Sequence, residues 1–264
     1  MSTIALLGIP IMWSREEQLQ VSIPTATDQP RSDLERILRE NVSGIEIVDL
    51  GELTTPTEIV SDGDYKTLGS KARDLIHNSK ANTVLVIGGD HASALPFYHL
   101  RGQKVRADAH GDAYVFDPSA SVGVYGGNYM FHVEQRGLNH GYEVLNVGIN
   151  TNGIGNWGIV GKSVDIEEIL GTSKPSNTAF LDIDVDVLSR NYLLPHGEST
   201  SNLLAKDLAK LITGLKPSVI GLFECVGNNG YIPPNIVSRY PRVFTPIVRA
   251  VGQLALSQTH QNSY

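Results

Sequence analysis

Short apolar runs alternate with amphipathic segments along this chain. Seven runs rich in β-branched residues predict strands covered on both faces: residues 4–9, 45–50, 83–87, 103–109, 143–149, 178–186 and 218–224. Apolar residues recur at helical spacing most clearly over residues 202–215, and more weakly over 33–40, 58–78 and 245–257. Residues 10–29 and 227–241 show neither pattern, which predicts long loops. This alternation is typical of an α/β fold with a parallel sheet and helices on both faces.

Composition and charge narrow the class of protein. The 264 residues include 21 lysines and arginines against 28 aspartates and glutamates, a net charge of −7, which argues against a nucleic-acid partner. The single cysteine excludes an internal disulfide and fits a reducing compartment. No apolar run reaches membrane-spanning length, and the N-terminus lacks a basic leader. We therefore expect one domain over residues 1–264, cytoplasmic, with no membrane partner.

The first chemical signal follows the apolar run that ends at Ile87. Gly88 and Gly89 permit a sharp turn out of the strand, and Asp90 and His91 come directly after them. One interpretation makes Asp90 the N-cap of a following helix. The other makes His91 a functional histidine at the carboxyl end of a buried strand.

The second signal is the group Asp108, His110 and Asp112. On a continued strand Asp108 and His110 would point to one face, and Gly111 could turn the chain so that Asp112 returns to the same place. Oxygen and imidazole ligands suit manganese, iron or zinc. The alternative is a solvated acidic loop.

The third signal is the run of Asp182, Asp184 and Asp186, which alternate with isoleucine and valine. A strand would place all three carboxylates on one face, where they repel one another unless a cation lies among them. A solvated edge strand is the alternative. Together the three signals offer more ligands than one metal ion needs, which favours two ions that share carboxylates.

The three ordered motifs resemble those of the ureohydrolase superfamily, which includes arginase, agmatinase and formimidoylglutamase. The matches are Gly-Gly-Asp-His at 88–91, Asp-Ala-His-x-Asp at 108–112 and a later Asp-x-Asp. Residues 48–51 and 221–224 look like further strand ends of the family. The resemblance implies a three-layer α/β/α fold, two Mn²⁺ ions per chain, and hydrolysis of a guanidino or formimino C–N bond in a small cationic substrate.

The resemblance also implies roles for individual residues. One metal ion would be held by His91, Asp108, Asp112 and Asp184, and the other by Asp108, His110, Asp184 and Asp186. The motif fits a second register as well, in which Asp182 and Asp184 are the ligands. Asp112 would move a proton during the reaction, and Glu224 would pair with the substrate cation. Tyr114 and Asn128 are candidate substrate contacts.

This chain departs from the family pattern at several positions. Ser189 and Arg190 replace the usual Asp-Pro after the third motif, and Gly127 stands where a proton-shuttle histidine is expected. Tyr114 replaces the asparagine of arginases, which favours an agmatinase-like substrate over arginine.

Two other interpretations remain open. A metal-binding protein with lost or altered activity would explain the missing histidine. A deacetylase on the related fold would need a His-His pair, which the sequence lacks. The family's frequent trimers and hexamers suggest a homo-oligomer.

Overall fold

A parallel β-sheet forms the centre of the protein. The computed structural model describes residues 2–14, 19–22, 26–53, 58–59, 62–113, 124, 126–135, 137–149, 159–172, 178–188, 203–225 and 235–259. The sheet order is β4 (Ile45–Glu52), β1 (Ser2–Ile9), β6 (Thr83–Gly88), β11 (Val219–Phe223), β10 (Thr178–Asp184), β7 (Gln103–Ala107), β8 (Val144–Val147) and β9 (Lys162–Ser163). Every neighbouring pair is parallel, which confirms the expected sheet.

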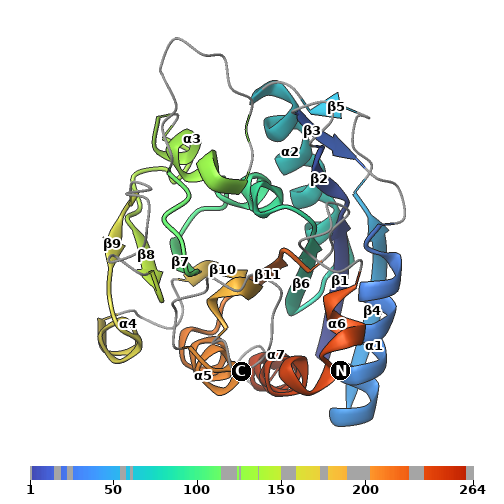
Figure 1. Ribbon diagram of the computed structural model, residues 1–264. Helices are drawn as coiled ribbons and strands as arrows, with labels where there is room; N and C mark the ends of the chain where they lie inside the picture. The colour runs from blue at the N-terminus through green and yellow to red at the C-terminus, as the bar shows by residue number, and fades with distance from the viewer. Residues whose placement is uncertain are drawn as a thin grey trace.

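Helices cover both faces of this sheet (Figure 1). One face carries α1 (Asp28–Asn41), α4 (Ile166–Thr172), α5 (Ala205–Leu215), α6 (Ile236–Arg239) and α7 (Pro241–Thr259). The other carries α2 (Asp62–Ser79), the 3₁₀ helix η1 (His91–Phe97) and α3 (Tyr129–Gln135). Two short 3₁₀ turns, η2 (Gly126–Asn128) and η4 (Val185–Val187), complete the described helices. The expected three-layer α/β/α architecture is therefore present.

Successive residues of the strands supply two separate cores. On β1, Ile4 and Leu6 pack with α1 and α7, whereas Ala5 and Leu7 pack with α2 and η1. Because successive side chains of a strand point to opposite faces, a strand buried on both faces must be apolar throughout. No helix of the described chain is long and apolar enough to cross a membrane.

The segment expected to be a long loop at residues 10–29 contains regular structure instead. Strands β2 (Ile11–Ser14), β3 (Leu19–Ser22) and β5 (Glu58–Ile59) form a small antiparallel sheet, and α1 begins at Asp28. The expectation was wrong because strands this short gain their order from pairing with a distant segment, as β3 does with β5.

Two strands end earlier than their apolar runs predict. Strand β7 ends at Ala107, so Asp108 and His110 follow it in a bend. Strand β10 ends at Asp184, and η4 then carries Asp186. The three aspartates of the third motif therefore do not lie on one continuous strand, and turns set the directions of the last carboxylates.

Candidate metal centre

His91 reaches the centre of the molecule because η1 begins directly after β6. Asp90 is the N-cap residue of η1, and its Oδ1 accepts a hydrogen bond from the Ala92 amide at 2.8 Å. The chain turns closely at Gly88, where an added Cβ would lie 2.4 Å from the Phe223 ring. The Phe223 ring stacks on the His91 imidazole with 5.5 Å between centroids. On the sequence alone, an N-cap role for Asp90 and an inward-facing His91 are alternatives, and the structure contains both.

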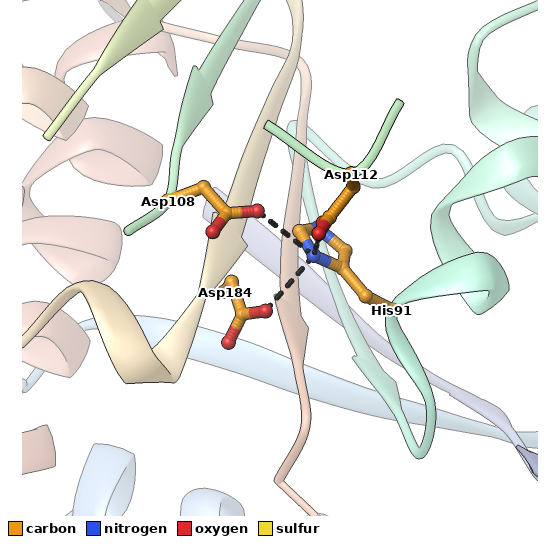
Figure 2. Close-up of side chains that lie close together, drawn as sticks. All are labelled: His91, Asp108, Asp112 and Asp184. Atoms are coloured by element: carbon orange, nitrogen blue, oxygen red, sulfur yellow. Dashed lines mark ion pairs between the residues drawn. The ribbon is translucent and has the colours of Figure 1, made fainter. Parts of the chain in front are cut away.

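Three carboxylates converge on one nitrogen of His91 (Figure 2). Its Nδ1 lies 2.9 Å from Asp184 Oδ2 and 3.1 Å from the Oδ2 atoms of both Asp108 and Asp112. All four side chains are buried. Within the described residues this Nδ1 has no hydrogen-bond partner of acceptable geometry. A buried nitrogen facing three carboxylate oxygens in this way is the arrangement expected around a cation.

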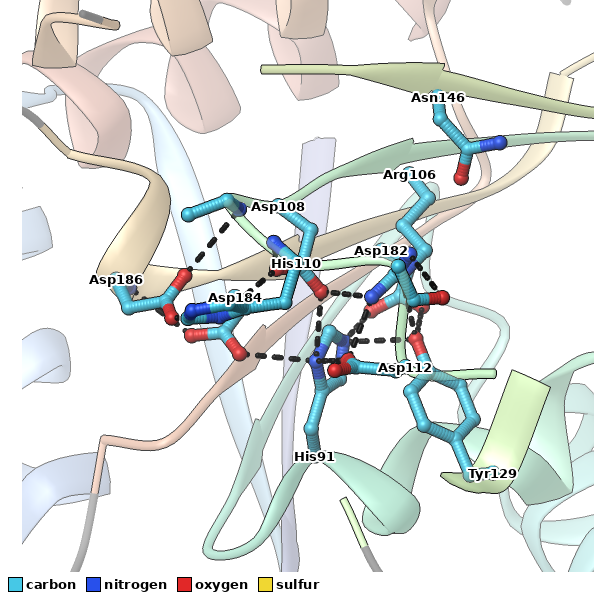
Figure 3. Close-up of polar contacts among 12 residues, drawn as sticks. His91, Arg106, Asp108, His110, Asp112, Tyr129, Asn146, Asp182, Asp184 and Asp186 are labelled. Atoms are coloured by element: carbon cyan, nitrogen blue, oxygen red, sulfur yellow. Dashed lines mark hydrogen bonds and ion pairs between the residues drawn. The ribbon is translucent and has the colours of Figure 1, made fainter. Parts of the chain in front are cut away.

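The other ring nitrogen of His91 is held by Asp182 (Figure 3). His91 Nε2 lies 2.9 Å from Asp182 Oδ1, and Asp182 Oδ2 accepts hydrogen bonds from the hydroxyls of Tyr98 at 2.7 Å and Tyr129 at 2.9 Å. An ionised carboxylate only accepts, so Asp182 favours a proton on Nε2 and leaves the Nδ1 lone pair for a cation. Among the described acidic and histidine groups, Asp182 belongs to none that could surround a metal ion. This geometry favours the register with Asp184 and Asp186.

A second group gathers around His110. Its Nδ1 lies 2.7 Å from Asp186 Oδ2 and 3.9 Å from Asp108 Oδ1, and its backbone amide donates to Asp108 Oδ1 at 2.7 Å. Asp108 therefore directs one carboxylate oxygen to each group, Oδ2 toward His91 and Oδ1 toward His110. Asp184 and Asp186 also lie close to Glu224 in a third group.

Two of the candidate residues have left-handed backbone conformations. Asp112 has a φ of 47° and Glu224 a φ of 57°. The surrounding structure holds both turns, since the carbonyl of Asp112 accepts from the Met130 amide at 3.0 Å and the Glu224 amide donates to Gly89 at 2.7 Å. Such conformations cost energy in residues other than glycine and concentrate at functional sites. Here they turn two carboxylates toward the same region.

The protonation equilibria show how strongly these buried groups interact. Burial works against the charged imidazole of His91, but Asp182 and Asp184 raise its pKa well above the ordinary value. Burial, and then the charge of Asp108, raise the pKa of Asp112 to about 6. Burial, with the charges of Asp184 and Asp186, raises the pKa of Glu224 well above its usual range. The carboxyls of Asp112 and Glu224 are therefore difficult to ionise without a compensating positive charge.

The donor set fits a divalent cation. It consists of carboxylate oxygens and imidazole nitrogens, which suit Mn²⁺ and similar ions. A metal ion at His91 Nδ1 would replace the proton that the carboxylates otherwise attract to that nitrogen. Two such groups are present among the described residues: one of His91, Asp108, Asp112 and Asp184, and one of Asp108, His110 and Asp186.

The other residues that the sequence singled out lie outside the described groups of possible metal ligands or outside the described residues. Asn128 is buried in η2, next to Gly127. His132, the first histidine after Gly127 in the sequence, lies in α3 beside Phe131 and belongs to none of the described groups that could hold a metal ion. Tyr114, Ser189 and Arg190 lie outside the described residues.

Sequence reasoning missed Arg106, Tyr98 and Tyr129, which contact the candidate ligands. Arg106 donates to the Asp112 carboxylate at 2.5 Å, to that of Asp108, and to the Tyr129 hydroxyl at 2.8 Å. A signal was present, because Arg106 interrupts a predicted strand that is buried on both faces, where a charged side chain requires a partner.

Comparisons with proteins of known structure identify the fold of this chain. No family model and no curated protein sequence matches the chain. A hypothetical agmatinase from Burkholderia thailandensis is 14% identical, covering 99% of this chain and 88% of its own, with a TM-score of 0.59. Arginase from Bacillus cereus is 18% identical, covering 96% and 98%, with a TM-score of 0.57. Trypanosoma cruzi formiminoglutamase with Mn²⁺ is 13% identical, covering 97% and 93%, with a TM-score of 0.61. These neighbours are ureohydrolase superfamily members, and the chain has their arginase-like α/β fold.

Proposed function

We propose that this chain is a hydrolase of the ureohydrolase type, which uses two Mn²⁺ ions to cleave a guanidino or formimino C–N bond. The observation that carries this proposal is the convergence of three buried carboxylates on His91 Nδ1, while Asp182 holds Nε2. The fold shared with arginase, agmatinase and formiminoglutamase supports the reaction class.

The charge balance supports two ions rather than one. Five aspartates are buried around His91 and His110: Asp108, Asp112, Asp182, Asp184 and Asp186. The buried guanidinium of Arg106 contacts two of them, Asp108 and Asp112. Arg106 can offset one negative charge, and two divalent ions would offset the other four. We assign His91, Asp108, Asp112 and Asp184 to one ion and Asp108, His110, Asp184 and Asp186 to the other. When bound, the ions would supply activated water and Lewis-acid stabilisation of developing charge.

The remaining chemistry belongs to the chain's own side chains. We assign to Asp112 the role of accepting a proton and passing it to the leaving amine, because its carboxylate lies at the His91 position, with Oδ2 3.1 Å from His91 Nδ1. Glu224 adjoins Asp184 and Asp186, where its carboxylate would pair with the planar substrate cation. Asn128 and Tyr114 would contact the substrate, and Tyr114 favours an agmatine-like substrate over arginine.

A second candidate function is metal binding with lost or altered turnover. Gly127 occupies the place where the resemblance leads us to expect a shuttle histidine, and the candidate metal groups among the described residues contain only His91 and His110 as histidines. This reading predicts metal content without product from any guanidino compound.

An activity panel distinguishes the two functions. We would load the protein with Mn²⁺, measure its metal content, and follow urea or ammonia release from agmatine, arginine and formimidoylglutamate. Asp108→Ala should abolish both metal content and activity, because Asp108 directs an oxygen to each group. The control Asp165→Ala removes an exposed carboxylate from the start of α4 and should retain both. Full Mn²⁺ retention in Asp108→Ala would contradict the ligand assignment.

A further inference from the structure

Arg106 is a fully buried cation beside the candidate metal ligands. Its side chain is 0% exposed and extends from β7 toward α3 (Figure 3). Each guanidinium nitrogen has an acceptor: Nε donates to Tyr129 Oη at 2.8 Å, Nη1 donates to the Gly111 carbonyl at 3.2 Å, and Nη2 donates to Asp108 and Asp112. These contacts hold the positive charge in one place.

The guanidinium shares its acceptors with only one of the two candidate metal positions. Nη2 contacts the Oδ2 atoms of Asp108 and Asp112, and these are the same atoms that lie 3.1 Å from His91 Nδ1. The Asp108 oxygen that faces His110 is Oδ1. Arg106 therefore pairs with the carboxylate oxygens that face the candidate metal position at His91, and not with the Asp108 oxygen that faces His110.

A permanent cation at this place opposes a metal ion in two ways. It takes up lone pairs on two oxygens that would bind the ion, and its charge repels a second cation nearby. Arginine remains charged in proteins, so the guanidinium cannot relieve this repulsion by losing its proton. The same charge also reduces the repulsion between Asp108 and Asp112 when no metal ion is bound.

We propose that Arg106 is an internal counter-ion that competes with the divalent cation for Asp108 and Asp112, and so weakens metal binding at the His91 position. It is a positioning residue, since it acts through the two aspartates. This inference rests on the proposed metal centre.

Titration calorimetry with Mn²⁺ on the metal-free protein tests the inference. Arg106→Met should tighten one of the two binding steps by at least about tenfold, because the competing charge is removed. Arg106→Lys keeps the charge but loses the forked hydrogen bonds, so its affinity in that step should rise by less than that of Arg106→Met. The melting temperature of metal-free Arg106→Met should fall, and Mn²⁺ should raise it by more than it raises that of the unsubstituted protein.

The chain offers a matched control in Arg31. This arginine is also buried and is paired with Asp28 and Asp49, which lie in α1 and β4 rather than beside His91. Arg31→Met should lower the melting temperature with and without Mn²⁺ to a similar extent, and should leave both binding constants unchanged. A change confined to the Arg106 variant is therefore not a general effect of removing a buried charge.

The possible outcomes separate this inference from the proposed function. Equal or weaker Mn²⁺ binding by Arg106→Met overturns the inference while the metal centre stands. Failure of both the unsubstituted protein and Arg106→Met to bind Mn²⁺ overturns both. If metal-free Arg106→Met does not fold, the variant is refolded with Mn²⁺ and its affinity is measured by competition with a chelating dye. The same tightening is expected there, and its absence overturns the inference.

Discussion

The two ring nitrogens of His91 lie in different environments, and the difference explains why the residue is suited to binding a metal ion. Nε2 meets the carboxylate of Asp182, which is itself held by two tyrosine hydroxyls. Nδ1 meets three carboxylates with no hydrogen bond in the described structure. A partner on one nitrogen fixes the ring and directs the lone pair of the other toward the cation.

Asp182→Ala should lower Mn²⁺ affinity by about 10- to 100-fold, because the His91 ring loses the group that orients it. Asp182→Asn keeps one acceptor oxygen and should lose less. Calorimetric titration measures both variants. If Asp182→Ala and Asp182→Asn bind Mn²⁺ as tightly as the unsubstituted protein, Asp182 does not orient His91.

The sequence placed Asp184 in both possible registers of the third motif, but it left open whether Asp182 is a ligand beside it. Both belong to Asp-x-Asp pairs with apolar neighbours, and both lie on strand β10. The structure distinguishes them through the position of η1, which brings Nε2 against one carboxylate and Nδ1 against the other. That position depends on packing between distant segments, which local periodicity does not encode.

The junction of β6 with η1 shows how closely packed elements set the position of His91. Gly88 leaves room for the Phe223 ring, which in turn stacks on His91. Strand β11, which carries Phe223, is hydrogen-bonded to β6. A side chain at Gly88 would therefore push on the ring that supports the imidazole.

Gly88→Ala should destabilise the protein by about 1–3 kcal/mol through overpacking, and should also weaken Mn²⁺ binding. Gly252→Ala is the control, because its Cβ would meet Val42 at 2.5 Å, where α7 packs in the core on the opposite face of the sheet. The control should lose stability but keep its Mn²⁺ affinity. Chemical denaturation and metal titration measure the two effects, and equal losses of affinity in both variants would contradict a local role for Gly88.

How well an element could be predicted from the sequence depends on how far apart along the chain its contacting residues are. Helix α5 was expected from its apolar stripe, and Leu208, Leu211, Ile212 and Leu215 are all buried in it. The small sheet of β2, β3 and β5 was missed because its strands are short and pair with distant segments. Local periodicity reports burial against a large core, but it carries little information about such pairing.

Strand order brings the motifs together across the whole molecule. Strands β6, β11, β10 and β7 are neighbours in the sheet, and the candidate residues follow or end these four strands. Because all four run parallel, their carboxyl ends share one edge. The result is a buried group of carboxylates whose mutual repulsion Arg106 offsets only in part and bound divalent cations would reduce further.

Removing metal should therefore destabilise the entire protein. With Mn²⁺ at about a hundred times its dissociation constant, binding adds about 2.7 kcal/mol, or about 5–10 °C in melting temperature for a chain of this size. A chelator should remove that increment, and added Mn²⁺ should restore it. Asp108→Ala should show no Mn²⁺-dependent increment, and the same increment in this variant would contradict its role as a ligand.

The amino-acid order was enough to predict the parallel sheet and to single out His91, Asp108, His110, Asp112 and Asp184, because continuous apolar runs must be buried and charged groups at their ends need partners. The contacts of Arg106, the place of Asp182 on Nε2, and the pairing of β2, β3 and β5 came from the folded arrangement. These features depend on where strands end and on which distant segments meet. The free energy of packing the whole chain selects both, so no local stretch of residues specifies them.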